Sequence, residues 1–242
     1  SNISFGFGAS AKTGSIAELI AKNKKAVIIT DESLVKLGML TILDKSLKDS
    51  GFEVKVFAQK SIEPTLKQTI EVCEAVKAGN YGIIIGFGGG SSLDRAKIAS
   101  CFASMPDKIL EYVAPGGKNI PEDNVVPKIL IPTTSGTGSE ASNTAVVIVP
   151  NEELGSTKTW VTGNAVLADA VIIDPDYMKN LPQRVTAATG FDALSHCAEG
   201  ILSKQANSFS DALALEAVKI VSKNLRTAYH RGNENPESRW NM

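Results

Sequence analysis

The stretch GIIIGFGGGSSLD, residues 82–94, decides the fold of this chain. Its apolar first part is typical of a strand buried on both faces, and residues 91–103 continue as a helix. Between them stand four glycines within five residues, which is more than a tight turn with positive φ requires. Backbone N–H groups free of side chains, at the positive start of a helix, suit a pyrophosphate. The stretch therefore predicts a strand, a phosphate-binding turn and a helix in succession.

This turn departs from the usual dinucleotide-binding fingerprint GxGxxG. Ser91 occupies the position of the third glycine, and the turn follows the third predicted strand instead of the first. The simpler interpretation is a strand-to-helix turn that needs glycine only for its backbone conformation. The number of glycines favours phosphate binding over that interpretation.

Short β-branched runs alternate with helical periods on both sides of this stretch, which is the pattern of a mainly parallel sheet covered by helices. We expect strands at residues 26–30, 52–57, 82–86, 128–132 and 170–174, helices at 34–48, 64–77 and 91–103, and a hairpin of residues 145–150 and 157–162. These elements predict an α/β, Rossmann-like nucleotide-binding domain that spans residues 1–180.

From Gln183 onward the pattern is helical throughout. Helices are expected at residues 185–202 and 208–229, followed by a polar loop after Arg231. Residues 181–242 thus indicate the start of an all-helical domain, and we expect it to be truncated because so thin a bundle leaves its apolar stripes uncovered. Exposed stripes favour association, so a homo-oligomer is expected.

Composition argues against several classes of partner. A chain of 242 residues with 43% hydrophobic content and a net charge of -1 is a globular protein without the basic surface that binds nucleic acid. No apolar run approaches the roughly 20 residues that span a bilayer, and residues 1–8 lack a secretion signal, so no membrane partner and a cytoplasmic location are expected. The cysteines Cys73, Cys101 and Cys197 lack metal-type spacing and are expected to be reduced thiols. Ser1-Asn2 is interpreted as a remnant of an expression tag.

A second polar segment, TTSGTGSE at residues 133–140, follows the predicted strand at 128–132. Open α/β sheets bind ligands beyond the carboxyl ends of their strands, and the hydroxyl groups here suit ribose and phosphate. Taken alone, the segment is better explained as a helix N-cap followed by a polar turn. Together with the glycine turn it favours a nucleotide.

Asp31 directly follows the predicted strand at 26–30. A carboxylate at this point accepts hydrogen bonds from an adenosine ribose and repels a 2′-phosphate. It serves equally well as an Asx turn or as the N-cap of a helix at Ser33. The sequence does not choose between these roles.

One pair of residues indicates a metal site. Asp192 and His196 lie four residues apart in GFDALSH, so on a helix they share one face and can bind one divalent cation. A helix-capping aspartate beside an ordinary histidine explains the same spacing. Two ligands alone rarely hold a metal, and the other histidine, His230, is expected to be solvated at the end of the last helix.

In this order the segments resemble the iron-containing alcohol dehydrogenases, whose fold is akin to that of dehydroquinate synthase, over nearly the whole chain. The matching residues are Thr30-Asp31, GGGS at 88–91 with Asp94, Ala96 and Lys97, PTT at 132–134 with Thr137, Ser139 and Glu140, Asp174-Pro175, and AATGFDALSH at 187–196 with Glu199. As an ordered set they are far more specific than any single glycine motif.

The resemblance implies a metal-dependent alcohol dehydrogenase or aldehyde reductase that transfers a hydride between the nicotinamide of NAD and a metal-bound alcohol or aldehyde. Asp31 matches the position that favours NAD over NADP. The other implied cofactor contacts are Gly89, Gly90, Ser91 and Asp94 at the pyrophosphate and ribose, Thr133, Thr134 and Thr137 along the nucleotide, and Lys158 at the nicotinamide ribose. The implied catalytic residues are Asp192, His196 and Lys158, and the first two are ligands of Fe²⁺, although such ligands also suit Zn²⁺.

Two departures limit what the resemblance implies. Family members carry two further histidine ligands downstream that this chain lacks, so we expect it to be incomplete for catalysis. Glu63 stands where many relatives have asparagine, and a carboxylate there cannot donate to the cofactor. The alternative hypothesis is a nucleotide-binding or oligomerising module without catalysis. The identity of the alcohol or aldehyde stays open.

Overall fold

The computed structural model describes residues 2–60 and 64–242, so Glu63 lies outside the described residues. The chain forms two compact units. Unit 1 comprises Ser1–Pro132 and Ser139–Asp174, and unit 2 comprises Thr133–Gly138 and Pro175–Met242. The polar segment Thr133–Gly138 therefore belongs with the C-terminal helices.

Unit 1 is built on a parallel sheet of six strands. The strands, in spatial order, are β1 (Asn2–Phe5), β8 (Ala170–Ile173), β5 (Lys128–Pro132), β4 (Ile83–Gly88), β2 (Lys25–Asp31) and β3 (Glu53–Gln59). The strands β2, β4 and β5 are buried almost throughout, as a parallel sheet covered on both faces requires. The predicted α/β class is confirmed.

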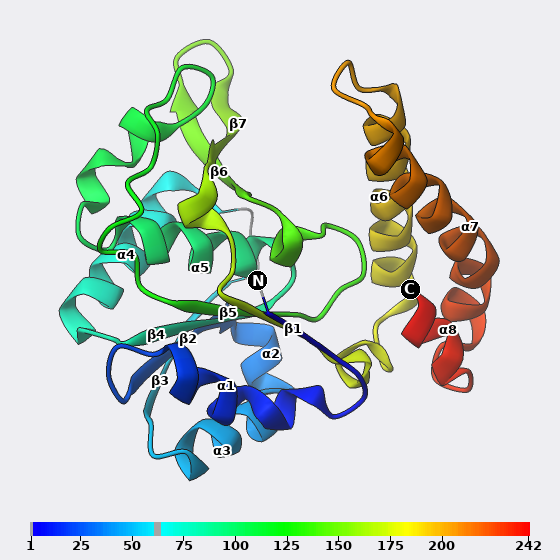
Figure 1. Cartoon of the computed structure of the whole chain (residues 1–242), viewed down its shortest axis with the longest axis horizontal. Coiled ribbons are helices and arrows are strands. Elements are labelled where there is room, and N and C mark those ends of the chain that lie inside the picture. Colours follow the sequence, from blue (N-terminus) through cyan, green and yellow to red (C-terminus); the bar gives the residue numbers. More distant parts are fainter. Residues whose placement is uncertain (1, 61–63) are drawn as a thin grey trace. The chain divides into compact units, whose positions relative to one another are not determined.

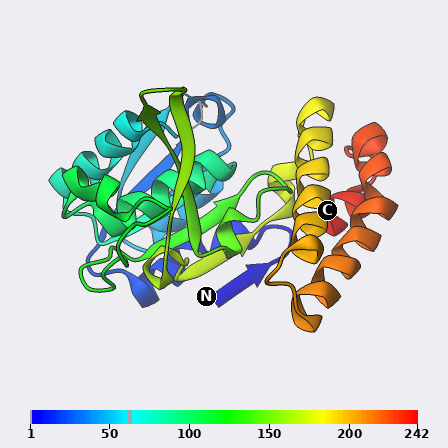
Figure 2. The same cartoon turned by 90° about the horizontal axis from the view of Figure 1, so that it is seen from above.

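Helices cover both faces of this sheet (Figure 1). The helices α4 (Leu66–Gly79) and α5 (Gly90–Phe102) lie over one face, while α1 (Thr13–Ile20) and α3 (Thr41–Asp49) lie over the other. An antiparallel hairpin of β6 (Thr144–Asn151) and β7 (Gly155–Thr162) packs on the outer side of α5 (Figure 2). Because α5 is enclosed between the sheet, α4 and the hairpin, every residue from Ser92 to Phe102 is buried.

A hydrophobic core lies between α4, α5 and the sheet. It joins Val72 of α4 and Leu93 of α5 to Ile84 of β4 and Val161 of the hairpin, all of them without solvent exposure. Burying one such side chain stabilises the fold by about 1.5–3 kcal/mol. This core fixes the start of α5 relative to the strand ends.

Unit 2 consists mainly of α6 (Gln183–Leu202), α7 (Ser208–Arg231) and the short α8 (Pro236–Asn241). The predictions of α6 and α7 are confirmed. Gly190 permits the close approach of α7, because a Cβ on it would lie 2.3 Å from a methyl group of Leu225. The exposed apolar residues on these helices include Phe191, Leu202, Phe209, Leu213 and Leu215. No helix in the described part of the chain combines the length and apolarity needed to cross a membrane.

The helix predicted at residues 34–48 is in fact two helices. The helix α2 (Glu32–Lys36) ends and α3 begins on either side of Gly38, which has a φ of 69°. Glycine adopts this left-handed conformation at little cost, whereas other residues rarely do. The prediction of one helix was wrong because the apolar residues keep their helical spacing across the break and so give no sign of it.

The polar loop predicted after residue 231 is followed by a helix, α8, that was not predicted. Asn235 caps this helix by accepting a hydrogen bond from the amide of Ser238 at 2.8 Å. Arg239 is 5% exposed and donates from Nη1 to the hydroxyl of Thr186 at 2.9 Å, which anchors α8 to α6. The helix was missed because an Asn-Pro pair serves a helix start as readily as a turn.

The described N-terminal residues are part of the sheet, so leaving Asn2 out of the predicted fold was wrong. Asn2 pairs with Ala170 in the register between β1 and β8, and the following helix α1 was also not predicted. At the end of β8, the carboxylate of Asp174 accepts hydrogen bonds from the amides of Gly8 and Ser10, each at 3.0 Å. It also accepts one from the Ser10 hydroxyl at 2.6 Å. Asp174 thus fixes the segment between β1 and α1.

Replacing Asp174 with alanine should lower the free energy of unfolding by about 3 kcal/mol, because it removes the acceptor of the buried amide and hydroxyl of Ser10 and of the Gly8 amide. Urea denaturation monitored by circular dichroism measures this loss. The matched control is Asp49→Ala, which removes an exposed carboxylate paired with Lys45 and should cost about 1 kcal/mol or less. Equal losses in the two variants would contradict the anchoring role of Asp174.

Candidate nucleotide-binding and metal site

The strand order places a topological switch point at the carboxyl ends of β2 and β4. The neighbour of β2 on one side is β3, and on the other side the sheet continues through β4 to β5, so the chain changes direction across the sheet at this point. Open α/β sheets bind ligands beyond the strand ends at such a switch point. Asp31 ends β2 and the glycine turn at residues 88–90 follows β4. Two features singled out in the sequence therefore meet at one place.

Gly88 requires glycine both for its conformation and for the space around it. Its φ of 143° is rare for residues with side chains, and a Cβ on it would lie 2.9 Å from the Ser92 side chain and 3.2 Å from Oδ2 of Asp31. A side chain at this position would fill the space beside the strand ends. The bare backbone fits the close approach of a pyrophosphate.

The start of α5 carries no side-chain cap. Gly89 is the N-cap residue, and its carbonyl accepts hydrogen bonds from the amides of Ser92 and Leu93. Helix geometry leaves the preceding amides, those of Gly90 and Ser91, without an intrahelical acceptor. Both residues are partly exposed. Outward-pointing amides at the positive end of a helix are a setting that binds anions.

Asp31 is buried and forms an ion pair. Its Oδ2 accepts a hydrogen bond from the Ser92 hydroxyl at 2.8 Å, and its Oδ1 lies 3.4 Å from Nη2 of Arg95. Burial lowers the pKa of Arg95, and the Asp31 carboxylate opposes that shift. The Asp31 side chain makes no capping hydrogen bond to α2. The side chain therefore does not cap α2, which was one of the roles left open by the sequence.

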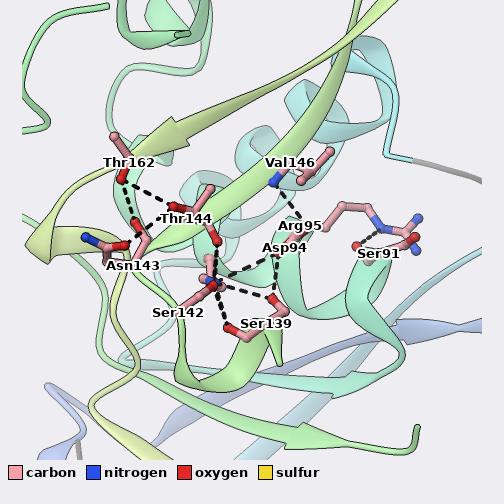
Figure 3. A network of polar contacts seen from close by, with 10 residues as sticks. Ser91, Asp94, Arg95, Ser139, Ser142, Asn143, Thr144, Val146 and Thr162 are labelled. Carbon is pink, nitrogen blue, oxygen red and sulfur yellow. Dashed lines mark hydrogen bonds and ion pairs between the residues drawn. The ribbon is translucent and has the colours of Figure 1, made fainter. Parts of the chain in front are cut away.

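Asp94, in the first turns of α5, connects this helix to the hairpin segment (Figure 3). Its carboxylate accepts hydrogen bonds from the Ser139 hydroxyl at 2.6 Å and from the Val146 amide at 3.1 Å. Burial raises the pKa of Asp94, while the hydrogen bond from Ser139 and the positive charges of Lys97 and the exposed Lys158 lower it. The carboxylate thus holds residues 139–146 against the helix.

Lys97 follows one turn later and is fully buried. Its Nζ donates to the carbonyl oxygens of Ser139 at 2.6 Å and Thr144 at 2.5 Å, and to the Ser142 hydroxyl at 3.1 Å. Burial lowers the pKa of Lys97 to about 8, and the Asp94 carboxylate, 3.9 Å away, partly offsets that effect. Lys97 and Asp94 together fix the same segment from neighbouring positions.

The residues Thr133, Thr134 and Thr137 lie in unit 2. Thr133 is buried, whereas Thr137 is exposed. Gly136 packs against α6, because a Cβ on it would lie 2.6 Å from the carbonyl oxygen of Thr189. The segment leads only into a three-residue 3₁₀ turn, so it does not cap an α-helix as the alternative interpretation required. Its hydroxyl groups are carried by the same unit as the predicted metal ligands.

Asp192 and His196 share one face of α6, as their spacing predicts. Nε2 of His196 lies 3.8 Å from Oδ1 of Asp192, and both side chains are about half exposed, at 48% and 41%. A carboxylate and an imidazole suit a divalent cation. Within residues 2–60 and 64–242, no group of three or more His, Cys, Asp or Glu side chains converges. The donors therefore fit a metal in kind but are too few to enclose it.

Arg95 and the structural role of Lys97 were not predicted from the sequence. A signal was present, because DRAK at residues 94–97 puts three charges into a helix of otherwise small and apolar residues that follows a buried strand. Charges on a helix without a solvent-facing side must be paired inside the protein. That requirement predicts partners for all three residues but does not say which segments provide them.

Comparison with known proteins assigns the family. The model of the iron-containing alcohol dehydrogenases matches residues 1–175, and that of the C-terminal part of the Fe-containing alcohol dehydrogenase family matches residues 186–242. This chain belongs to the iron-containing alcohol dehydrogenase family. The resemblance inferred from the ordered motifs is confirmed, as is the Rossmann-like α/β part followed by helices.

Curated members of the iron-containing alcohol dehydrogenase family include a long-chain-alcohol dehydrogenase of Geobacillus thermodenitrificans, 39% identical over 87% of this chain and 52% of the relative. A sulfoacetaldehyde reductase of Bilophila wadsworthia is 40% identical over 87% of this chain and 53% of the relative. The chain spans about half the length of these curated relatives.

Solved structures of the family share the fold of the whole chain. The sulfoacetaldehyde reductase of Bifidobacterium kashiwanohense in complex with NAD⁺ is 30% identical with a TM-score of 0.88, over 100% of this chain and 62% of that one. A 1,3-propanediol oxidoreductase is also 30% identical, with a TM-score of 0.90 over 100% of this chain and 61% of the other.

The pH dependence of stability tests the burial of Lys97. Between pH 8 and about 10.5 the unfolded chain keeps a lysine proton that the folded chain has lost, so the free energy of unfolding should rise with pH in this window. Over this window the free energy of unfolding of the wild type should rise by a few kcal/mol relative to that of Lys97→Met, since each pKa unit corresponds to about 1.4 kcal/mol. Below pH 8 the difference should be constant.

Urea denaturation at a series of pH values measures this gain. Lys223→Met, which replaces an exposed lysine on α7, is the matched control and should run parallel to the wild type. A wild type that runs parallel to Lys97→Met from pH 8 to 10.5 would contradict the lowered pKa of Lys97.

Proposed function

We propose that this chain provides the dinucleotide-binding part and two metal ligands of a metal-dependent, NAD-linked alcohol dehydrogenase or aldehyde reductase. The observation that carries the proposal is the meeting of the uncapped start of α5 with Asp31 at the switch point between β2 and β4. Membership in the iron-containing alcohol dehydrogenase family supports it, as does the NAD⁺ complex of a relative with the same fold.

In this proposal the pyrophosphate of NAD binds at the glycine turn, where the amides of Gly89, Gly90 and Ser91 donate to its oxygens. Asp31 accepts a hydrogen bond from the adenosine ribose, since a carboxylate has lone pairs beyond the two that Ser92 and Arg95 engage. The proposed contacts that complete the cofactor site are those of Asp94, Thr133, Thr134, Thr137 and Lys158. NADP is the weaker ligand because its 2′-phosphate meets the Asp31 carboxylate.

The reaction moves a hydride between a small alcohol or aldehyde and the cofactor. When bound, the nicotinamide supplies the hydride acceptor, and a divalent metal supplies Lewis acidity toward the substrate oxygen. Asp192 and His196 are the residues of this chain that would hold the metal, Fe²⁺ or Zn²⁺, by virtue of their shared face on α6. Lys158 is proposed to orient the nicotinamide ribose.

A second candidate is a nucleotide-binding or oligomerising module without catalysis. The observation that favours it is that only two metal-type donors converge on α6 among the described residues. Elemental analysis after dialysis against Fe²⁺ or Zn²⁺ separates the candidates, because one retained equivalent of metal supports the dehydrogenase and a metal-free protein that still binds NAD supports the module. A homo-oligomer in the cytoplasm, without nucleic acid or membrane partners, is proposed for both.

A carboxylate placed at the proposed pyrophosphate site should weaken NAD binding without harming the fold. Ser91→Glu puts a negative charge in the first turn of α5, where it should compete with the pyrophosphate and lower the affinity for NAD at least about tenfold. The same charge interacts favourably with the helix dipole, so stability should be unchanged or rise by about 0.3–1 kcal/mol. Isothermal calorimetry with NAD and urea denaturation measure the two effects.

The matched control is Ser208→Glu, which adds the same charge to the exposed first turn of α7. It should leave the affinity for NAD at the wild-type value. If Ser91→Glu binds NAD as tightly as the control does, the glycine turn is not the pyrophosphate site and the proposed function loses its main support.

A further inference from the structure

Arg95 forms a buried ion pair with Asp31 at the switch point between β2 and β4. The Arg95 side chain has no solvent exposure, and that of Asp31 is 9% exposed. Nη1 of Arg95 donates to the side-chain oxygen of Gln59 at 2.7 Å, and Nε donates to the carbonyl oxygen of Ser91 at 3.1 Å. The guanidinium is therefore held in one place by β2, β3 and the first turn of α5.

The charge of Arg95 depends on Asp31 for its compensation. Its other partners, Gln59, the Ser91 carbonyl and the Ser92 hydroxyl, are neutral, and Asp31 is the only carboxylate in contact with it among the described residues. Removal of one member of a buried pair leaves the other charge uncompensated, which is strongly unfavourable. Without Asp31, the guanidinium would be a preorganised site for an incoming anion.

The position of this pair indicates which anion would bind there. In Rossmann-like domains a carboxylate at the strand end binds the 2′-hydroxyl of the adenosine ribose, and an arginine nearby accommodates the 2′-phosphate of NADP. This chain contains both residues, in contact with each other. The carboxylate stands against the Gly88 backbone, 3.2 Å from where a Cβ would be, and it neutralises the arginine.

We infer that Arg95 is a second residue that determines cofactor specificity, a 2′-phosphate-binding cation that Asp31 masks. The pair sets the preference for NAD over NADP, and loss of Asp31 converts the site to one that prefers NADP. This inference rests on the proposed dinucleotide site and adds to it the identity of the group that receives the extra phosphate.

Four proteins test this inference: the wild type, Asp31→Ser, Arg95→Met and the double variant. The ligands are ADP-ribose and its 2′-phosphate, which lack the nicotinamide and so need no metal or substrate. Calorimetry should show that the wild type prefers ADP-ribose, and that Asp31→Ser binds the phosphorylated ligand at least about tenfold more tightly than the wild type does. The double variant should lose that gain, because neither charge remains.

The comparison stays decisive if Asp31→Ser fails to fold. Asp31→Asn keeps an acceptor for the Ser92 hydroxyl while removing the charge, and it should show the same gain, again lost when Arg95→Met is added. A gain that persists in the double variant would overturn the role of Arg95, and so would a charge-removing variant that binds the phosphorylated ligand no better than the wild type.

The failure of the proposed function has a different signature. If the wild type binds ADP-ribose and the variants bind its 2′-phosphate no more tightly, the dinucleotide site is supported and the proposed role of Arg95 is wrong. If none of the four proteins binds either ligand, the dinucleotide site itself is wrong and the inference falls with it. Arg95→Met alone should bind ADP-ribose and reject its 2′-phosphate, because the Asp31 charge then remains unopposed.

Discussion

Helix α5 is buried from Ser92 to Phe102, and its three charged side chains must therefore find partners inside the protein. Arg95 reaches the ends of β2 and β3 through Asp31 and Gln59. Asp94 and Lys97 reach the segment before and within β6. The three charges thus link the helix to two different parts of unit 1, and loss of one partner would leave a buried charge uncompensated.

This arrangement fixes the start of α5, where the first amides have no acceptor within the helix. The first residue of α5, Gly90, belongs to the glycine turn, the turn follows the central strand β4, and Asp31 stands beside it at the end of β2. An anion site requires that such donors be in place before the ligand arrives, since ordering them on binding would cost affinity. The buried charges further along the helix provide that rigidity, so the polar network of α5 serves both stability and binding.

The sequence predicted five of the six strands of the sheet, all but β1, together with the hairpin, α4 to α7 and the position of the glycine turn, because buried β-branched runs and regular apolar spacing are local signals. It did not predict the break at Gly38, since the apolar pattern continued through it, or α8, since Asn-Pro is compatible with both turn and helix start. Among the candidate site residues, the shared face of Asp192 and His196 on α6 followed from spacing alone. The pairing of Arg95 with Asp31 did not, because it depends on the order in which strands lie in the sheet.

The central claim is that the start of α5 and the glycine turn bind the pyrophosphate of NAD. Amide hydrogen exchange of the whole chain with and without saturating NAD tests it most directly. Peptides covering residues 88–92 should become protected when NAD binds, while residues 139–146, already held by Asp94 and Lys97, should change little. Binding of NAD by calorimetry without any added protection at residues 88–92 would contradict the claim.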